Sequence, residues 1–408
     1  MPNTQEIFGL PKILIDFQTQ STTAIARSAR GIGVLIINDA LLDNEWKSYT
    51  VEDTDDIPAT GWSDKTIDLV KKALLGTPLK LLVYLIPPAT KTVTTGEGDA
   101  ATTEEVASTI TQATVLKDLA AAQWNYICHP TGKATDQEDL ASWIKSQRSN
   151  NHKTFKAVVA NHAADSYGVI NFTTGGINIV NPAWTDALAE HDGDETQIPS
   201  TIPHYLVYTA AEYTARITGI LCGISLDRSA TYYELDEVVK VDAYDNINTN
   251  INNGELCLFD EKDGNGVKIA RACNSLHTFT TNIGEDFRYI KIVEAIDLIH
   301  DDIANTFRNN YVGKIVNSYD NKMLFISAIH VYFDGLKGDV LDTSAAVENY
   351  VEIDTNAQKN WAALRGIKVE DMEDNEIDML NTGTNVFLRG VITPVNAMED
   401  LTLHFTIA

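Results

Sequence analysis

The chain has 408 residues, a length that is too great for one ordinary hydrophobic core and predicts two or three domains. Its hydrophobic content of 44% is enough to form them. Its 57 acidic residues outnumber 31 Lys and Arg, so the formal net charge is -26. This charge excludes a nucleic-acid or anionic-membrane surface, because both need clustered cations. No apolar run approaches the roughly 20 residues of a membrane-spanning helix, so we expect a soluble protein.

The cysteines are widely spaced and form no C-x-x-C pair: Cys128, Cys222, Cys257 and Cys273. The N-terminus has neither a basic start nor an apolar signal core. We therefore expect reduced thiols in a protein made in the cytoplasm.

Residues 1–24 predict an N-terminal arm that carries one strand. After a Gly and Pro turn, Ile13, Ile15 and Phe17 alternate with other residues and share one face of an extended chain. The small polar stretch 18–23 that follows predicts a flexible tether.

Residues 25–250 predict an α/β domain, because apolar runs that suit strands alternate with helical patterns. The unbroken apolar run at 31–39 is typical of a strand buried on both faces. Further strands are predicted at 79–86, 124–128 and 155–160, and helices at 64–74, 104–122, 136–146 and 206–221. This order favours a largely parallel sheet, with a surface loop at 90–103 and a rim hairpin within 168–180.

An Asn-rich stretch at 242–254 predicts the boundary to a second domain, residues 251–394, of compact α+β type. The next clear helix has apolar residues at helical spacing and acidic residues that we expect to face outward. The apolar residues are Ile292, Ile296, Ile299, Ile303 and Phe307, and the acidic ones Asp297, Asp301 and Asp302. Its other elements are a hairpin of strands 255–259 and 267–273, a helix through 325–336, strands 347–353 and 386–392, and a short helix capped by Asp354 or Thr355.

The chain closes with a C-terminal arm, residues 395–408, that also predicts a strand. Its last eight residues alternate apolar and polar, so four side chains share one face: Leu401, Leu403, Phe405 and Ile407. A terminal segment keeps such a pattern when it is tied into a sheet of its own chain or of a neighbour. Strands at both ends therefore suggest a subunit that assembles.

Sequence motifs for nucleotide and phosphate binding match this chain only weakly. The glycines at 31 and 33 precede a strand, whereas a dinucleotide site needs them after one. The turn at 130–135 contains Lys133 but lacks the spacing of a phosphate loop. We interpret it as a βα turn.

Two further candidates for chemistry also fail. Asp260, Asp263 and Asn265 lack the spacing of a calcium loop. Cys128 and His129 are neighbours on a strand and point to opposite faces, so we expect a core Cys and a rim His. We predict no catalytic, cofactor-binding or metal-ligating residue.

A resemblance is carried by stretches that occur in the same order along the chain: 9–12, 28–31, 228–232 (RSATY), 268–276 (KIARACNSL), 296–299 (IDLI), 311–314 (YVGK) and 392–399 (ITPVNAME). Together they resemble the contractile-tail sheath proteins of phages and phage-derived bacteriocins. The likeness covers nearly the whole chain and is strongest after Arg228. One departure is the pair Ala272 and Cys273, where Gly-Val is more typical.

The resemblance implies a structural protein that forms hexameric rings, stacked helically around an inner tube, and that contracts to drive the tube through a bacterial envelope. It implies an outer α/β domain, an inner α+β domain, and arms that add strands to neighbouring C-terminal domains. The implied partners are copies of itself, the tail tube protein, and baseplate and terminator proteins, with no cofactor. The implied location is a virion tail or phage-tail-like particle assembled in the bacterial cytoplasm.

Lys359 and Arg365 are candidates to face the tube. They offer exposed cations on a short helix of an otherwise acidic domain, and sheaths of this family hold their tubes mainly by the C-terminal domain. A solvated helix face is the alternative interpretation.

Two other classes of function remain as alternatives. The alternating first domain is compatible with an α/β enzyme, although fold does not imply function. A capsid or adhesin-like shell component would share the assembly signature without forming tubes.

Overall fold

The computed structural model describes residues 24–407 except Ala29, residues 96–101, Asp263, Asn265 and Ala345. By contacts the chain divides into two compact units. The described part of the large unit comprises residues 27–305, 336–348 and 392–407, and that of the small unit residues 24–26, Thr306–Gly335 and Asn349–Val391. The division into domains at 250/251 stays a prediction.

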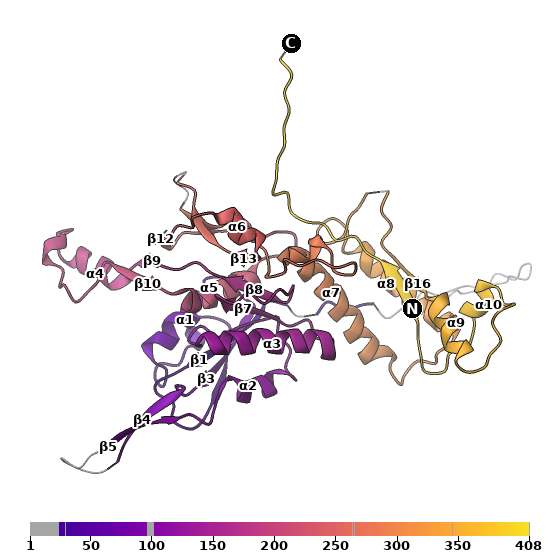
Figure 1. Cartoon of the computed structure of the whole chain (residues 1–408), viewed down its shortest axis with the longest axis horizontal. Coiled ribbons are helices and arrows are strands. Elements are labelled where there is room, and N and C mark those ends of the chain that lie inside the picture. The colour runs from indigo at the N-terminus through magenta and orange to yellow at the C-terminus, as the bar shows by residue number, and fades with distance from the viewer. Residues whose placement is uncertain are drawn as a thin grey trace, which may run out of the picture. The chain divides into compact units, whose positions relative to one another are not determined.

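A seven-stranded sheet forms the centre of the large unit, in the order β13-β8-β7-β6-β1-β3-β2. Figure 1 labels β1, β3, β7, β8 and β13 of this sheet. All neighbours pair in parallel except β2, which runs antiparallel to β3. The predicted parallel-rich α/β fold is therefore confirmed. The strands are β1 (Ile32–Asn38), β2 (Lys47–Val51), β3 (Lys80–Ile86), β6 (Tyr126–Cys128), β7 (Lys156–Ala160), β8 (Val169–Phe172) and β13 (Glu255–Leu256).

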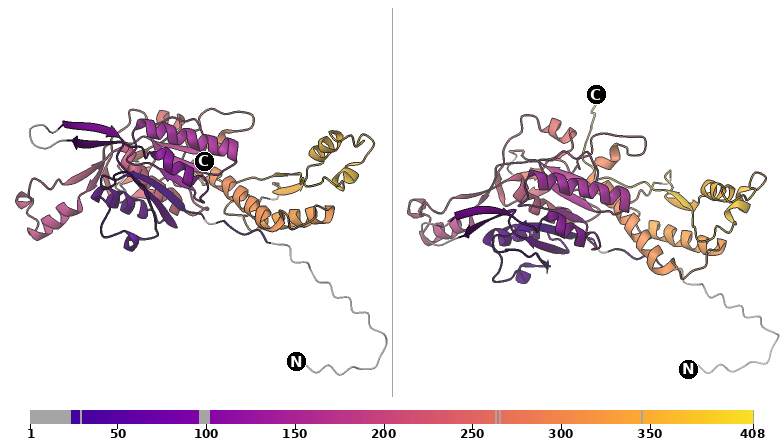
Figure 2. Two further views of the ribbon diagram at one scale, coloured as in Figure 1. Left: turned by 90° about the horizontal axis from the view of Figure 1, so that it is seen from below. Right: turned by 60° about the horizontal axis from the view of Figure 1, so that its bottom comes forward.

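Helices cover both faces of this sheet, as the second set of views also shows (Figure 2). On one face, α1 (Asp64–Leu74) and α5 (Ala210–Gly223) pack against Leu35 and Ile37 of β1. On the other, α2 (Gln112–Leu119) and α3 (Ala134–Asn151) pack against alternate residues such as Val34. The unbroken apolar run of β1 is thus buried on both faces, as predicted.

Glycines allow α1 and α5 to cross closely. A Cβ built on Gly219 of α5 would lie 1.9 Å from the carbonyl oxygen of Ala73 in α1, a distance that no side chain can adopt. Larger residues there would force the helices apart.

The remaining elements of the large unit are smaller. Strands β10 (Tyr205–Tyr208), β9 (Ile177–Val180) and β12 (Val238–Lys240) form one sheet, and β11 (Glu234–Leu235), β15 (Val267–Ile269) and β14 (Leu258–Asp260) another. A ribbon joins β4 (Thr90–Thr95) to β5 (Thr102–Ala107). The helices are α4 (Pro182–Glu190), α6 (Ile247–Asn252), α7 (Ile290–Thr306) and the 3-10 turns Thr54–Asp56, Glu195–Gln197 and Glu285–Arg288.

Several predicted elements are wrong. Residues 90–95 and 102–107 pair as two strands, where a loop and the start of a helix are predicted, because β-branched Thr and Val favour strands there. The helix starts only after Thr111. The predicted hairpin within 168–180 is absent, since β8 and β9 join different sheets. Residues 205–208 are strand β10, and α5 begins after the cap Thr209.

The small unit contains a π-helical turn (Phe307–Tyr311), α8 (Tyr319–Asp334), α9 (Thr355–Ala363), α10 (Asp374–Asp378) and the antiparallel pair β16 (Tyr350–Ile353) and β17 (Leu388–Val391). Asp354 caps α9 by accepting a hydrogen bond from the backbone N–H of Ala357, as predicted. These elements match the expected α+β character of the later part of the chain.

Candidate functional site

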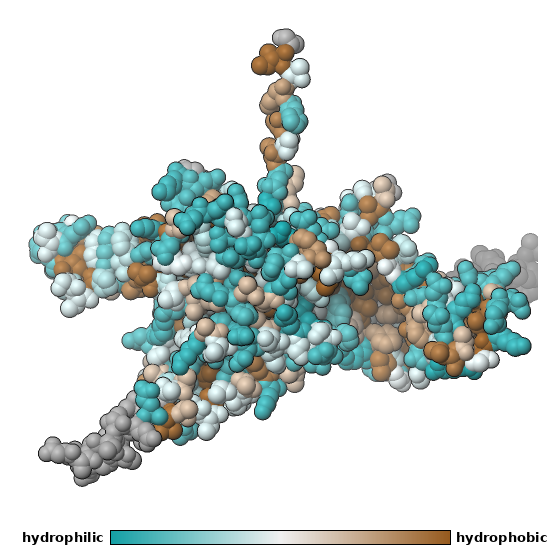
Figure 3. Space-filling model, viewed as in Figure 1, coloured by the Kyte–Doolittle hydropathy of each residue, from teal (hydrophilic) through white to brown (hydrophobic). Residues whose placement is uncertain are grey.

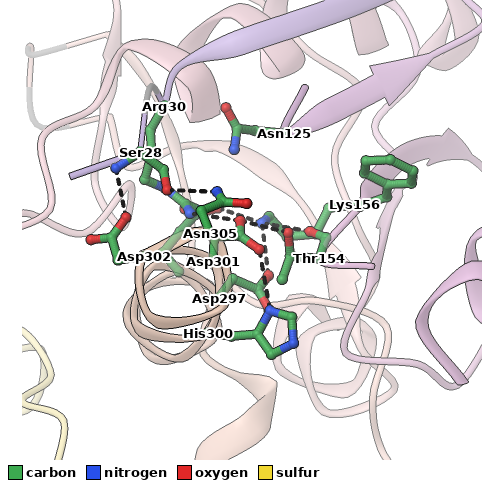
Figure 4. Close-up of polar contacts among 12 residues, drawn as sticks. Ser28, Arg30, Asn125, Thr154, Lys156, Asp297, His300, Asp301, Asp302 and Asn305 are labelled. Atoms are coloured by element: carbon green, nitrogen blue, oxygen red, sulfur yellow. Dashed lines mark hydrogen bonds and ion pairs between the residues drawn. The ribbon is translucent and has the colours of Figure 1, made fainter. Parts of the chain in front are cut away.

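The residues that follow the N-terminal arm are bound to helix α7. The backbone N–H of Ser28 donates to Asp302 at 2.6 Å, and the side chain of Asn305 donates to the Ser28 hydroxyl at 3.2 Å. Arg30 donates to Glu294 at 2.5 Å and lies 3.6 Å from Asp301. We call these contacts the N-arm anchor (Figure 4).

Helix α3 and the interior strand β7 contribute further cations to the same face of α7. Arg148 of α3 binds both carboxylate oxygens of Asp297, at 2.7 and 3.0 Å. Lys156 of β7 lies 2.8 Å from Asp297 and 3.0 Å from Glu294 and is 1% exposed. Three cations, Arg30, Arg148 and Lys156, and three acids, Glu294, Asp297 and Asp301, therefore form one largely buried network.

The network keeps its carboxylates ionised. Burial alone would raise the pKa of Glu294, but the charges of Lys156 and Arg30 outweigh it and lower this pKa to about 2. Burial is likewise outweighed at Asp297, where Lys156 and Arg148 lower the pKa to about 2. The prediction that Asp297, Asp301 and Asp302 face outward is wrong, since Asp297 and Asp302 are buried and Asp301 accepts from Thr154.

The C-terminal arm begins at a second anchor. The carboxylate of Glu399 accepts from the hydroxyls of Ser229 and Thr231, at 2.9 and 2.7 Å, and lies 3.5 Å from Arg271. Arg271 also donates to Asp400 at 2.6 Å. We call these contacts the C-arm anchor.

Beyond the C-arm anchor the chain has no partner among the described residues. Residues 401–407 belong to no strand or helix. Figure 3 shows this segment extending from the surface, with hydrophobic residues (brown) alternating with polar ones. The residues predicted to form an intersubunit strand are exposed to solvent. The exposed fraction is 89% for Leu401, 63% for Leu403, 84% for Phe405 and 96% for Ile407. The N-terminal candidates Ile13, Ile15 and Phe17 lie outside the described residues.

The two tube-facing candidates lie at and just beyond α9 in the small unit. Lys359 is half-buried, whereas Arg365 is exposed. The guanidinium of Arg365 stacks on the ring of Trp361 at 4.1 Å, so its charge is held over an aromatic face. The two cations are therefore not equally available to a partner.

Side chains bond to one another at the crevice in which α/β enzymes bind ligands. In such sheets it lies where strand order reverses, here between β1 and β6. His129, at the end of β6, contacts the side-chain oxygens of Asn38 and Gln112, at 2.5 and 2.8 Å. Burial lowers its pKa to about 4. The prediction of a rim His is wrong, because this residue is 1% exposed.

The turn around Lys133 already has one of its backbone amides bonded within the chain. It connects β6 to α3, as predicted for a βα turn. The backbone N–H of Lys133 donates to the carboxylate of Asp136 at 2.7 Å, so a side chain occupies the position at the helix N-terminus that an anion would take.

Other chemistry finds no support in the part of the chain that is described. No group of three His, Cys, Asp or Glu residues there could hold a metal ion. None of its helices has the length and apolar character to cross a membrane. All four cysteines are free and buried.

Sequence reasoning missed both anchors, although one signal was present. Glu294, Asp297, Asp301 and Asn305 recur every three or four residues and so share one face of α7. A polar helix face of this kind can either be exposed to solvent or form ion pairs with buried cations. Nothing in the local sequence points to Arg30, Arg148 and Lys156 as its partners.

Comparison with known proteins gives concordant matches. Residues 283–408 match the family described as phage tail sheath C-terminal domain. The tail sheath protein of Clostridium phage phiCD119 is 32% identical over 97% of this chain and 99% of its own length.

Solved structures share the fold. The sheath tail protein of Desulfitobacterium hafniense matches with a TM-score of 0.61 and 18% identity, over 84% of this chain and 94% of its own. The contracted helical sheath of the anti-feeding prophage matches with a TM-score of 0.63 and 14% identity, over 98% of this chain and 99% of its own.

Proposed function

This chain belongs to the tail sheath protein family, and we propose that it is the repeating structural subunit of a contractile tail. In this proposal copies form hexameric rings, stack helically around an inner tube, and contract to drive the tube through a bacterial envelope. The partners are further copies, the tube protein, and baseplate and terminator proteins, in a virion tail or phage-tail-like particle assembled in the cytoplasm.

The exposed C-terminal arm carries this proposal. Four apolar side chains on one face of an extended segment are costly to leave in water, because each stabilises by about 1.5–3 kcal/mol when buried. The segment begins at a fixed point, the C-arm anchor, and has no partner in the described part of its own chain. A neighbouring copy is the natural partner for such an arm.

A structural role also agrees with the interior of the large unit. His129 and Asp136 occupy the positions where an α/β enzyme would bind a ligand. The relatives are named as sheath proteins, which points away from an enzyme. The rigid sheet and the buried network favour a unit that moves as one body while arms keep neighbours connected.

We place the tube contact on the small unit, with Lys359 and Arg365 as its candidate cations. Arg365 is the better candidate, since it is exposed and held over Trp361.

Negative-stain microscopy of the purified chain tests the proposal. Hollow tubes of regular diameter are expected, alone or with tube protein. Closed shells or irregular patches would instead support a non-tubular shell component, and monomers with substrate turnover would support an enzyme.

A further inference from the structure

A cavity in the large unit lies beside the N-arm anchor. It has a volume of about 310 Å³, at the lower end of the roughly 300–1,000 Å³ range of ligand pockets. The segment before β1, the start of β6, the end of α5 and the first turns of α7 line it, and we call it the α5–α7 cavity. Most of its walls are apolar: Leu221, Ile224, Leu226, Ala230 and Ile290. The carbon chain of a ligand would lose its contact with water against these walls.

The buried end of the cavity, its floor, has hydrogen-bond donors to spare. Tyr126 is 1% exposed, and its hydroxyl makes no well-formed hydrogen bond among the described residues. Asn125 is 5% exposed, and its Oδ1 accepts from the backbone N–H of Ile32 at 3.0 Å, which leaves its amide nitrogen to donate. The Nη1 atom of Arg30 is buried there as well and makes no hydrogen bond in the described part of the chain. Buried donors are costly to leave unpaired, so this floor calls for an acceptor from outside the chain.

Two cations line the cavity without a carboxylate bonded to them. Arg228 is exposed at the mouth of the cavity and forms no ion pair among the described residues. The Nζ atom of Lys291 donates to two uncharged backbone carbonyl oxygens, at 2.9 and 3.0 Å. Asp227 attracts both cations through space, but its carboxylate is bonded to the hydroxyl of Ser225. Burial lowers the pKa of Lys291, as expected for a cation without a bonded acid.

The balance of charge at the cavity is opposite to that of the whole chain. Three cations and one acid line it: Arg30, Arg228, Lys291 and Glu294. The chain as a whole carries a net charge of -26. The end of α5 and the start of α7 both lie at the cavity, and because they are opposite ends of helix dipoles their effects offset each other. The side chains therefore decide, and they favour an anion.

We propose that the α5–α7 cavity binds a small organic carboxylate. The carboxylate pairs with Arg228 and Lys291, and the carbon chain lies against the apolar walls. An acceptor oxygen at the other end of the molecule takes the donors of the floor, such as the Tyr126 hydroxyl. This site goes beyond the proposed function, which requires no ligand.

The position of the cavity gives such a ligand a structural effect. Arg30 and Glu294 belong to the N-arm anchor and Ser229 to the C-arm anchor, and all three line the cavity. A bound carboxylate therefore contacts the roots of both arms and stabilises the fold at these points.

Calorimetric titration of the full chain with succinate tests the site. Sodium chloride holds the ionic strength constant, so that the screening of this acidic chain is equal at every point. We expect saturable binding with one site per chain, and a melting temperature that rises with succinate concentration. The absence of both would overturn the proposal.

Two further probes show which part of the ligand is recognised. Succinamide keeps the carbon chain and the acceptor oxygens but has no charge, and it should bind roughly tenfold more weakly or worse. Inorganic phosphate keeps the charge but has no carbon chain, and it should also bind more weakly than succinate. Equal binding of succinamide would mean that the cations play no part, and equal binding of phosphate would mean a general anion site; either result overturns the proposal.

Variants test whether the binding takes place in this cavity. Arg228→Gln removes the exposed cation and should weaken succinate binding roughly tenfold or more. Tyr126→Phe removes a hydroxyl that makes no hydrogen bond, so it should melt as the parent chain does without ligand and still bind succinate less tightly. Lys71→Gln, at an exposed cation on α1 that does not line the cavity, is the matched control and should bind as the parent does. Parental affinity in Arg228→Gln would place the ligand elsewhere and overturn the proposal.

Discussion

Removal of Leu401–Ala408 should leave a folded, soluble subunit that no longer builds a continuous sheath. The apolar residues of this segment are 63 to 96% exposed, so they contribute little to the stability of the isolated subunit. The cut falls after Asp400 and leaves the C-arm anchor with Arg271 intact. We expect a loss of less than about 0.5 kcal/mol in the free energy of unfolding, as for other surface changes.

Docking of one arm is close to balanced. Burial of four apolar side chains contributes about 1.5–3 kcal/mol each. Ordering eight backbone units costs about 1–2 kcal/mol each, and strand hydrogen bonds add about 0.5–1.5 kcal/mol each. One arm is therefore a weak link, and the lattice depends on many arms, because each docked subunit raises the effective concentration of the next arm. Loss of every arm should abolish assembly cooperatively.

Thermal melting and sedimentation of the truncated chain decide the matter. A near-parental melt with monomer sedimentation is expected. Replacement of Thr402 and Thr406 by Ser, on the polar face, is the control and should leave assembly intact. A large drop in melting temperature or aggregation would mean that the segment completes its own chain's fold, and undiminished sheath formation would mean that the arm is dispensable; either result refutes the reasoning.

Asp297→Asn should cost roughly 3–5 kcal/mol in the free energy of unfolding, because it leaves Arg148 and Lys156 buried with one partner fewer. Folding lowers the pKa of Asp297 from 3.8 to about 2, so the stability that its ionised carboxylate contributes is present above pH 3.8 and is lost as the pH falls toward 2. The free energy of unfolding of the variant, measured by chemical denaturation, should therefore depend less on pH in that range than that of the parent chain. An equal pH dependence in both would contradict this. Replacement of all four cysteines by Ser or Ala should permit assembly, because burial raises the pKa of Cys128 and Cys273 to about 12 and keeps these thiols unreactive; polymers that dissolve in reductant would argue otherwise. Lys133→Ala should leave assembly and calorimetric nucleotide titrations unchanged, and saturable ATP binding lost in the variant would reverse that view. Charge reversal at Lys359 and Arg365 should abolish co-sedimentation with tube protein while sparing self-assembly, and unaltered co-sedimentation would remove these candidates.

Patterns that depend on neighbours in sequence could be predicted. The unbroken apolar runs predict β1 and β3, because a strand that is buried on both faces needs apolar residues at every position. The cap of α9 could also be predicted, because Asp354 bonds to Ala357, only three residues away. The strand predicted for the last eight residues stays a prediction, because residues 401–407 pair with no strand in the described part of the chain.

Features that depend on distant partners could not be predicted. Asp297 lies on a helix face that sequence alone assigns to water, and only the fold brings Arg148 and Lys156 to it across more than 140 residues. His129 is similar, since Asn38 and Gln112 enclose it from other elements. The helix predicted to begin at residue 104 is wrong for another reason. Residues 104–107 pair with β4, and this pairing outweighs their helical pattern.

The N-arm anchor has a mechanical consequence. Its contacts on α7 extend from Glu294 to Asn305, about 16 Å along the helix at roughly 1.5 Å per residue. A pull on the N-terminal arm along that axis is divided between Ser28 and Arg30, and the Arg30–Glu294 ion pair that bears part of it is largely shielded from water. The C-arm anchor also holds two residues, Glu399 and Asp400, but the Asp400 side chain is 77% exposed, so its ion pair with Arg271 is weakened by water. Under tension, the N-terminal arm should therefore be the stronger tether of each subunit.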